Sequence, residues 1–248
     1  MKLLKYVMTT DSGLAPNPFF GVCSLALCTP NHMNAKLEVG DWVIGHSSRK
    51  QGNKLVYAMR LTKILDMPSY FAAFPEKHPK PNGSLVEQCG DNMYNYRNGQ
   101  WTRLPSACHN NVDIFKQDQG HPVFLAEGED NFWYFGGDDN QLAAAFSDQF
   151  PELIKDRQGF SYERNAQLIA KFETWLRSMG CSGACGSPRD LPPQPSGTYL
   201  VQIDPEERWA SLSRAVAGST RPAGKTCSGN RQSVESAAKP RTERGGCS

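Results

Sequence analysis

Polar and aromatic side chains gather in a loop near the start of the chain, where residues 11–20 read Asp-Ser-Gly-Leu-Ala-Pro-Asn-Pro-Phe-Phe. Asp11 and Asn17 supply carboxylate and amide edges, and Phe19 stands beside them. A planar nucleic-acid base needs hydrogen bonds at its rim and an aromatic surface at its face. The loop therefore has the side chains of a base-binding site. The competing interpretation is a capped turn whose phenylalanines enter the core.

A second segment of this kind contains Asp91, Asn92 and Tyr94. The Asn92 amide can make a two-pronged contact to the edge of a base, and Asp91 can accept a proton or an exocyclic amine. Asp and Asn side chains also form hydrogen-bonded turns at the start of strands, which is the competing interpretation.

His109 is the best-placed general acid or base in the sequence, because a loop histidine titrates near neutral pH. Asp113 can orient its ring. Cys108 is adjacent, but neighbouring side chains on an extended chain point apart, so a direct Cys–His pair is disfavoured. The alternative is a surface histidine without a role.

Tyr134 lies in an aromatic run, residues 132–135, that ends in Gly136 and Gly137. Glycines let a backbone approach a ligand closely, so Tyr134 is a candidate base contact. Trp42 is a second candidate wall for a base. Core packing is the simpler interpretation of each aromatic side chain taken singly.

Two strand-like segments, residues 40–45 and 55–62, flank a polar loop that reads His-Ser-Ser-Arg-Lys-Gln-Gly-Asn-Lys. Both segments contain β-branched and aromatic residues, and Gly and Asn interrupt the loop, so we expect a hairpin with a basic tip. Ser47, Arg49 and Lys50 in this tip are candidate phosphate ligands.

The sequence contains no established catalytic signature: no phosphate-binding glycine loop, zinc-protease motif, hydrolase elbow or deaminase motif. The eight cysteines form no repeating disulfide framework, and their spacings do not match common zinc knuckles, so free thiols are favoured. Cys23 is a further candidate nucleophile. We predict no metal and no cofactor.

The net charge of +2 conceals an asymmetry along the chain. Residues 213–248 hold seven Lys or Arg and two Glu, a net charge of +5, whereas the rest of the chain carries −3. Any affinity for nucleic acid must therefore come from a local patch or from the tail. The sequence has neither an apolar run of membrane-spanning length nor a signal peptide, so we expect a cytoplasmic protein without a membrane partner.

The hydrophobic pattern predicts several short strands and one clear helix. Asn98-Gly99 between two strand-like runs is a strong hairpin signal. Apolar residues from Leu168 to Met179 recur at helical spacing, with Ser161 as the expected N-cap and Gly180 as the C-cap. Further strands are expected at residues 2–9, 22–28 (strand or buried helix), 122–126 and 131–135, and weak helical character at 67–74.

These elements predict an α+β fold with a small mixed or antiparallel, barrel-like β core and a few flanking helices. We place the domain at residues 1–195. Residues 196–248 have a low-complexity, mostly disordered composition, because Ser, Gly, Arg, Thr and Ala cannot bury enough surface to offset the entropy of ordering.

The order of these segments resembles the bacterial and phage family called nucleotide modification associated domain 2, over roughly residues 2–195. The strand pair of the first hairpin is also similar to the PUA-like barrels of the EVE and ASCH groups, in which a Gly-Asp strand opens a base pocket. The segments that carry the resemblance are residues 5–7, 11–18, 21–28, 40–45, 55–60, 91–94, 134–137 and 172–176.

The resemblance implies a role in DNA or RNA base-modification systems. The first hypothesis is recognition of a modified or flipped base in a nucleic acid or nucleotide, next to other base-modification proteins. The alternatives are an enzyme acting on a nucleobase or nucleotide, and a protein–protein adaptor. The candidate catalytic residues are His109, Asp91 and Asp11; the candidate base contacts are Asn17, Phe19, Trp42, Asn92, Tyr94 and Tyr134.

Overall fold

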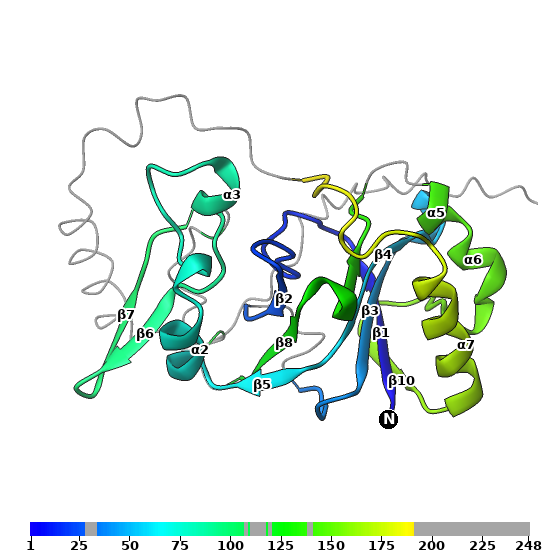
Figure 1. The fold of residues 1–248 in the computed structure, drawn as a ribbon, viewed down its shortest axis with the longest axis horizontal. Helices are drawn as coiled ribbons and strands as arrows, with labels where there is room; N and C mark the ends of the chain where they lie inside the picture. Colours follow the sequence, from blue (N-terminus) through cyan, green and yellow to red (C-terminus); the bar gives the residue numbers. More distant parts are fainter. Residues whose placement is uncertain (28–33, 107–108, 110–117, 119–120, 138–140, 191–248) are drawn as a thin grey trace, which may run out of the picture. The chain divides into compact units, whose positions relative to one another are not determined.

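A six-stranded mixed sheet organises the computed structural model, which describes residues 1–27, 34–106, 109, 118, 121–137 and 141–190 (Figure 1). Strand β1 runs parallel to β3, and the other contacts are antiparallel except the short pair at the β9 edge. From one edge to the other, the strands are β10 (Phe160–Glu163), β1 (Leu3–Met8), β3 (Trp42–Ser47), β4 (Leu55–Arg60), β9 (Phe132–Tyr134) and β11 (Gly183–Ala184).

The central strands of this sheet are buried on both faces. Successive side chains of a strand point to opposite faces, so Val43 enters one apolar layer, while Trp42 and Ile44 enter the other. All six residues of β3 are buried, which explains why its sequence reads as an apolar run rather than as an alternation. The sheet is therefore the middle of three layers.

The layer on one face contains a second, three-stranded antiparallel sheet (Figure 1). A separate hairpin is joined through Asn98 and Gly99, both at positive φ, as the Asn-Gly signal predicts. The three-stranded sheet contains β2 (Val22–Leu25), β8 (Val123–Glu127) and β5 (Lys63–Leu65), and the hairpin contains β6 (Tyr94–Arg97) and β7 (Gln100–Arg103).

Helix α7 (Ala166–Arg177) covers the other face of the six-stranded sheet with its buried apolar stripe (Figure 1). Its N-cap is Asn165, whose side chain accepts hydrogen bonds from the next turn, and not Ser161, which lies inside β10. The other helices are α2 (Met67–Ala73), α3 (Leu85–Gln88), α5 (Gln141–Ala144), α6 (Phe146–Gln149) and the 3-10 turns η1 (Arg49–Gln51), η2 (Pro75–Lys77), η3 (Glu129–Asn131) and η4 (Pro151–Leu153).

The fold is α+β, as the sequence predicts, but the described strands do not close into a barrel. The six-stranded sheet is open, with edges at β10 and β11, so the PUA-like barrel is not confirmed. The strands expected at residues 122–126 and 131–135 exist, yet they belong to different sheets, because the chain turns from one layer to the other at η3.

Both predicted hairpins and the strand at residues 2–9 are confirmed, and residues 22–25 form a strand. Cys89 is disulfide-bonded, contrary to the expectation of free thiols, whereas Cys23, Cys181 and Cys185 are free. No helix in the described part of the chain is long and apolar enough to cross a membrane. The predicted tail and the boundary at residue 195 lie outside the described residues.

Gly136 offers a test of how tightly the layers fit at the end of β9. It has φ of +72°, and a Cβ there would collide with the Ser187 carbonyl group. Gly159 has φ of +91° with open space around it, so it serves as the matched control. We expect Gly159→Ala to lower the free energy of unfolding by about 1 to 2 kcal/mol, the cost of a left-handed backbone.

Gly136→Ala adds an overpacking cost of about 1 to 3 kcal/mol to that backbone cost. Urea denaturation of the two variants measures the difference. Equal losses in both variants would show that the contact at Gly136 is not constraining.

Candidate functional site

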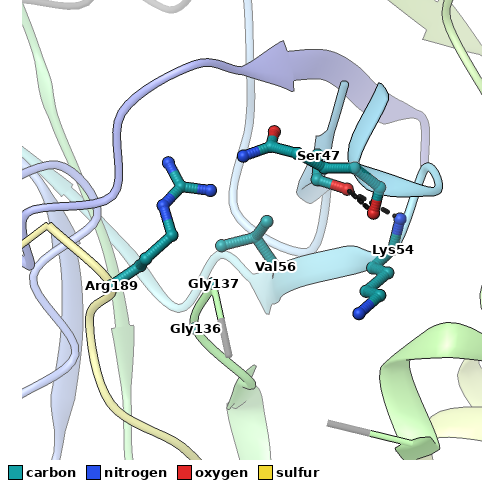
Figure 2. A pocket seen from close by; sticks show the side chains of 7 residues that line it. Ser47, Lys54, Val56, Gly136, Gly137 and Arg189 are labelled. Carbon is teal, nitrogen blue, oxygen red and sulfur yellow. Dashed lines mark hydrogen bonds between the residues drawn. The ribbon is translucent and has the colours of Figure 1, made fainter. Parts of the chain in front are cut away.

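A pocket of about 190 Å³ lies where the tip of the β3–β4 hairpin meets the chain that leaves β9. Figure 2 shows Arg189 on one side of it and Ser47 and Lys54 on the other, with Val56, Gly136 and Gly137 between them. Gln51 also lines the pocket. The pocket thus combines two cationic side chains, a hydroxyl and an amide, which is the composition of an anion-binding site.

The hairpin tip owes its shape to a bulge and a tight turn. The register of β3 against β4 shifts between Gly45 and His46, and bulges re-aim the side chains that follow them. The Ser47 hydroxyl accepts a hydrogen bond from the backbone N–H of Lys54 at 2.8 Å, which closes the tip. Arg49 and Lys50 are exposed on the intervening turn η1.

His46 lies buried next to this tip. Its Nε2 accepts from the backbone N–H of Lys155 at 3.0 Å, so Nδ1 carries the proton and donates to the Ser47 carbonyl at 2.8 Å. Burial lowers the pKa of this histidine, which keeps the ring neutral. His46 is therefore a positioning residue and not an acid–base group of the pocket.

Arg189 lines the opposite wall, and it belongs to the segment of residues 186–190 beside the end of β9. A Cβ at Gly136 would collide with the Ser187 carbonyl, and one at Gly137 would lie 2.5 Å from the Arg189 side chain. The two glycines were expected to make room for a ligand. In the structure they make room for the chain's own segment 186–190, which carries Arg189 to the pocket.

Asp11 fastens this segment from behind. Its carboxylate accepts hydrogen bonds from the Tyr134 hydroxyl and from the backbone N–H of Arg189, the latter at 3.2 Å. Its backbone pairs with Asp190: the N–H of Asp11 donates to the Asp190 carboxylate at 2.8 Å, and the N–H of Asp190 donates to the Asp11 carbonyl at 2.7 Å. Asp11 and Tyr134 therefore meet, as a structural anchor beside the pocket.

Burial raises the pKa of the Asp11 carboxyl, and the hydrogen bond from Tyr134 opposes that rise. Arg189 in turn donates to the Asp190 carboxylate at 2.7 Å through Nη2. The guanidinium also donates from Nε to Asp190 at 3.0 Å and from Nη2 to the Thr9 carbonyl at 3.3 Å. These contacts orient the guanidinium and leave the N–H groups of Nη1 to bind an anion.

Asn17 and Asp91 meet in a second, buried cluster centred on Lys77. The fully buried ammonium group of Lys77 donates to the Asn17 carbonyl at 3.0 Å, to its Oδ1 at 2.8 Å, and to the Ser24 hydroxyl at 3.0 Å. The Ser24 hydroxyl donates to Asp91 at 2.6 Å, and the Tyr70 hydroxyl donates to the other Asp91 oxygen at 2.8 Å. All three protons of the ammonium group have acceptors, so the cluster is a closed network.

Opposing effects act on the pKa values in this network. Burial lowers the pKa of Lys77, and the nearby Asp91 charge opposes the change. Burial likewise raises the pKa of Asp91. The charge of Lys77 and the hydrogen bonds from the Ser24 and Tyr70 hydroxyls oppose that rise. The neighbouring Asn92 donates from Nδ2 to the carbonyls of Tyr70 and Phe74, both at 2.9 Å, and so caps the end of α2.

Two tyrosines and a cysteine lie between the Asp11 anchor and the Lys77 network. The hydroxyls of Tyr6 and Tyr57 are 2.7 Å apart, and the charge of Asp11 acts on Tyr6. Burial raises the pKa of the Cys23 thiol to about 12, so Cys23 stays protonated at neutral pH and is not an activated nucleophile.

His109 belongs to a third cluster, also buried. Its Nε2 lies 3.0 Å from Oδ2 of Asp118, which also accepts from the Tyr94 hydroxyl at 2.6 Å. Asp118 thus occupies the orienting position that the sequence assigned to Asp113. Asp113 and Cys108 lie outside the described residues.

The remaining candidates are packed rather than open. Trp42 is fully buried against Trp133 and α7, and Phe19 is half-buried beside Phe20. Of the predicted site residues that the structure describes, Ser47 alone lines the pocket. Sequence reasoning missed Lys77, Asp118 and Arg189. A lysine four residues after the end of α2 and a lone Arg-Asp pair carry no local signal.

Residues 1–194 match the sequence profile of nucleotide modification associated domain 2. The chain belongs to that family. No curated protein and no solved structure matches the chain. Membership in the family implies involvement in nucleotide-modification systems. The match confirms the family resemblance that the order of segments along the chain indicates.

The Lys77–Asp91 network makes a thermodynamic prediction. Lys77→Met and Asp91→Asn each leave the opposite charge buried without its counter-charge, so each should lower the free energy of unfolding by about 3 to 5 kcal/mol. The double variant should lose clearly less than the sum of the two. Urea denaturation of all four proteins gives the coupling, and additive losses would show that the two charges do not interact.

The lowered pKa of Lys77 predicts a pH dependence. Between the folded-state pKa and the ordinary value of 10.5, the unfolded chain binds one more proton at Lys77 than the folded chain does. Stability contributed by this group therefore rises with pH through that interval.

The measurement is the difference in unfolding free energy between wild type and Lys77→Met, followed from neutral to alkaline pH. This difference should increase with pH. The contribution of the buried tyrosines to the pH dependence cancels in the difference, because both proteins contain them. A flat or falling difference would exclude a lowered pKa for Lys77.

Proposed function

We propose that this chain is a nucleotide-binding module of a nucleotide-modification system and that the pocket between Ser47, Lys54 and Arg189 holds a phosphate group of its ligand. The observation that carries the proposal is that Arg189, Lys54 and Ser47 line one small pocket. Phosphate oxygens accept hydrogen bonds from such groups, and guanidinium–phosphate pairs are among the strong ones.

The surroundings of the pocket support an anionic ligand. Arg49 and Lys50 lie exposed on the turn that also carries Gln51, so the tip adds positive charge beside the pocket mouth. Clustered charge of one sign raises the local concentration of the opposite ion and the rate of its association. The hairpin tip thus serves as the phosphate-binding element that its sequence predicts.

The volume of the pocket limits what it holds. About 190 Å³ is smaller than the roughly 300 to 1,000 Å³ of a typical small-molecule site. A phosphate with part of its sugar fits this space, and the base of the same ligand then lies outside it. Recognition of a modified or flipped base, in DNA or RNA, therefore needs a surface beyond this pocket.

Binding is favoured over acid–base catalysis for a specific reason. The carboxylates of Asp11 and Asp91 and the ring of His109 are buried and hydrogen-bonded to other protein groups. A general base must reach the proton that it abstracts, and none of these three residues lines the pocket.

Lys54→Gln tests the phosphate site. Calorimetric titration with a nucleoside 5′-monophosphate and with inorganic phosphate should show affinity falling about ten- to a hundredfold, the worth of one charge-assisted hydrogen bond. Wild-type binding should also weaken as salt rises.

The matched control is Lys36→Gln, which removes the same charge from an exposed lysine outside the pocket lining. Its affinity should stay within about twofold of wild type, as expected for an exposed, screened charge that does not line the pocket. Equal losses of affinity in the two variants would show that only the net charge of the protein matters. Phosphate binding unchanged by Lys54→Gln would refute the site.

A further inference from the structure

A second hollow, here called the Trp101 groove, lies on a different part of the molecule. It has a volume of about 510 Å³ and is bordered by β5, the first turn of α2, strand β7 and the residues that precede β8. Helix α2 packs beside β6 of the same hairpin (Figure 1). Its described lining includes Ile64, Asp66, Trp101 and His121.

The hairpin presents an aromatic pair beside this groove. Tyr96 and Trp101 are directly opposite in the β6–β7 register, so their side chains share one face, with ring centroids 5.0 Å apart. The next pair on that face, Tyr94 and Arg103, is buried. Tyr96 is 44% exposed and Trp101 is half-buried, so the outer pair presents aromatic surface to solvent. Such rings are the platforms on which nucleic-acid bases stack.

The charge of the groove restricts which bases can bind there. Among the described residues of its lining, Asp66 is the only acidic one, and His121 is present but no Lys or Arg. One oxygen of Asp66 accepts the backbone N–H of Ser69 at 2.7 Å, as the N-cap of α2, so the carboxylate is held in a fixed position. Its hydrogen bonds with Ser69 lower the pKa of Asp66, which is therefore ionised at neutral pH.

A fixed carboxylate beside an aromatic face repels phosphate and accepts hydrogen bonds from N–H groups. Guanine offers two adjacent donors on one edge, its ring N–H and its exocyclic amine. Adenine and cytosine each place a ring acceptor next to the amine, where it would face the carboxylate. The charge of the groove therefore complements guanine best among the common bases.

We propose that the Trp101 groove binds a guanine base, stacked on Trp101 and hydrogen-bonded through its N–H edge to Asp66. This inference rests on the proposed nucleotide-binding function and supplies the base-recognition surface that the phosphate pocket lacks. Neither Trp101 nor Asp66 belongs to the site residues that the sequence predicts.

Titration of the full chain with nucleosides tests the groove apart from the phosphate pocket, because nucleosides carry no phosphate. Guanosine should bind about tenfold or more tightly than adenosine and cytidine, and inosine, which lacks the exocyclic amine, should fall between them. Failure here, with phosphate binding at Lys54 intact, would overturn the groove and leave the proposed function standing.

Two variants assign the binding to named groups. Asp66→Asn keeps the helix cap, because Asn is as good an N-cap as Asp, but removes the charge, so guanosine should lose about tenfold while the protein stays folded. Trp101→Leu should lose about ten- to a hundredfold, whereas Trp101→Phe keeps an aromatic face and should lose only about threefold.

Unchanged guanosine affinity in both Asp66→Asn and Trp101→Leu would overturn the proposal. So would a proline-rich peptide that binds the wild-type groove while guanosine does not, since that result assigns the aromatic face to a protein partner. Circular dichroism and thermal melting of each variant verify that the fold is kept.

Discussion

The ammonium group of Lys77 has no access to water, and this single fact constrains a large part of the molecule. A buried charge is costly unless every donor is satisfied, so the chain must bring acceptors to it from several segments. Asn17 and Ser24 come from the first loop and β2, and the charge of Asp91 is relayed through the Ser24 hydroxyl. The network therefore fixes the first loop, β2, η2 and the turn before β6 against one another.

Asp11 fixes a second segment in place at the other end of the same loop. Its carboxylate and backbone hold residues 189 and 190 beside β9, and this placement brings the Arg189 side chain to the pocket. The Tyr6–Tyr57 pair and Cys23 lie between the two anchors. These interior polar groups stabilise the fold, and the sites that we propose for a ligand lie at the hairpin tip and in the Trp101 groove.

This division explains why the described candidate residues Asp11, Asp91 and His109 lie in separate buried clusters. The residue types that can bind a base are also the types that satisfy buried backbone and charge. Asn92 shows this overlap, because its amide nitrogen donates to the carbonyls of Tyr70 and Phe74 at the end of α2. Trp42 and Tyr134 likewise lie in the packed layers of the sheet. Pocket residues such as Lys54 and Arg189 have no distinctive local sequence pattern, because the pocket that they line is formed by segments far apart in the sequence.

The sequence by itself determined the local elements: the β3–β4 and β6–β7 hairpins, the α7 stripe, the α+β class and, through the order of its segments, the family. These features depend on the spacing of apolar and turn-forming residues over short distances, which a single chain displays directly. Only the tertiary structure decided the open sheet, the assignment of β8 and β9 to different layers, and the partners of each polar residue. Asp11 and Tyr134 are 123 residues apart and Lys77 and Asn17 are 60 apart, and pairings at such separation follow from packing of the layers and not from local pattern.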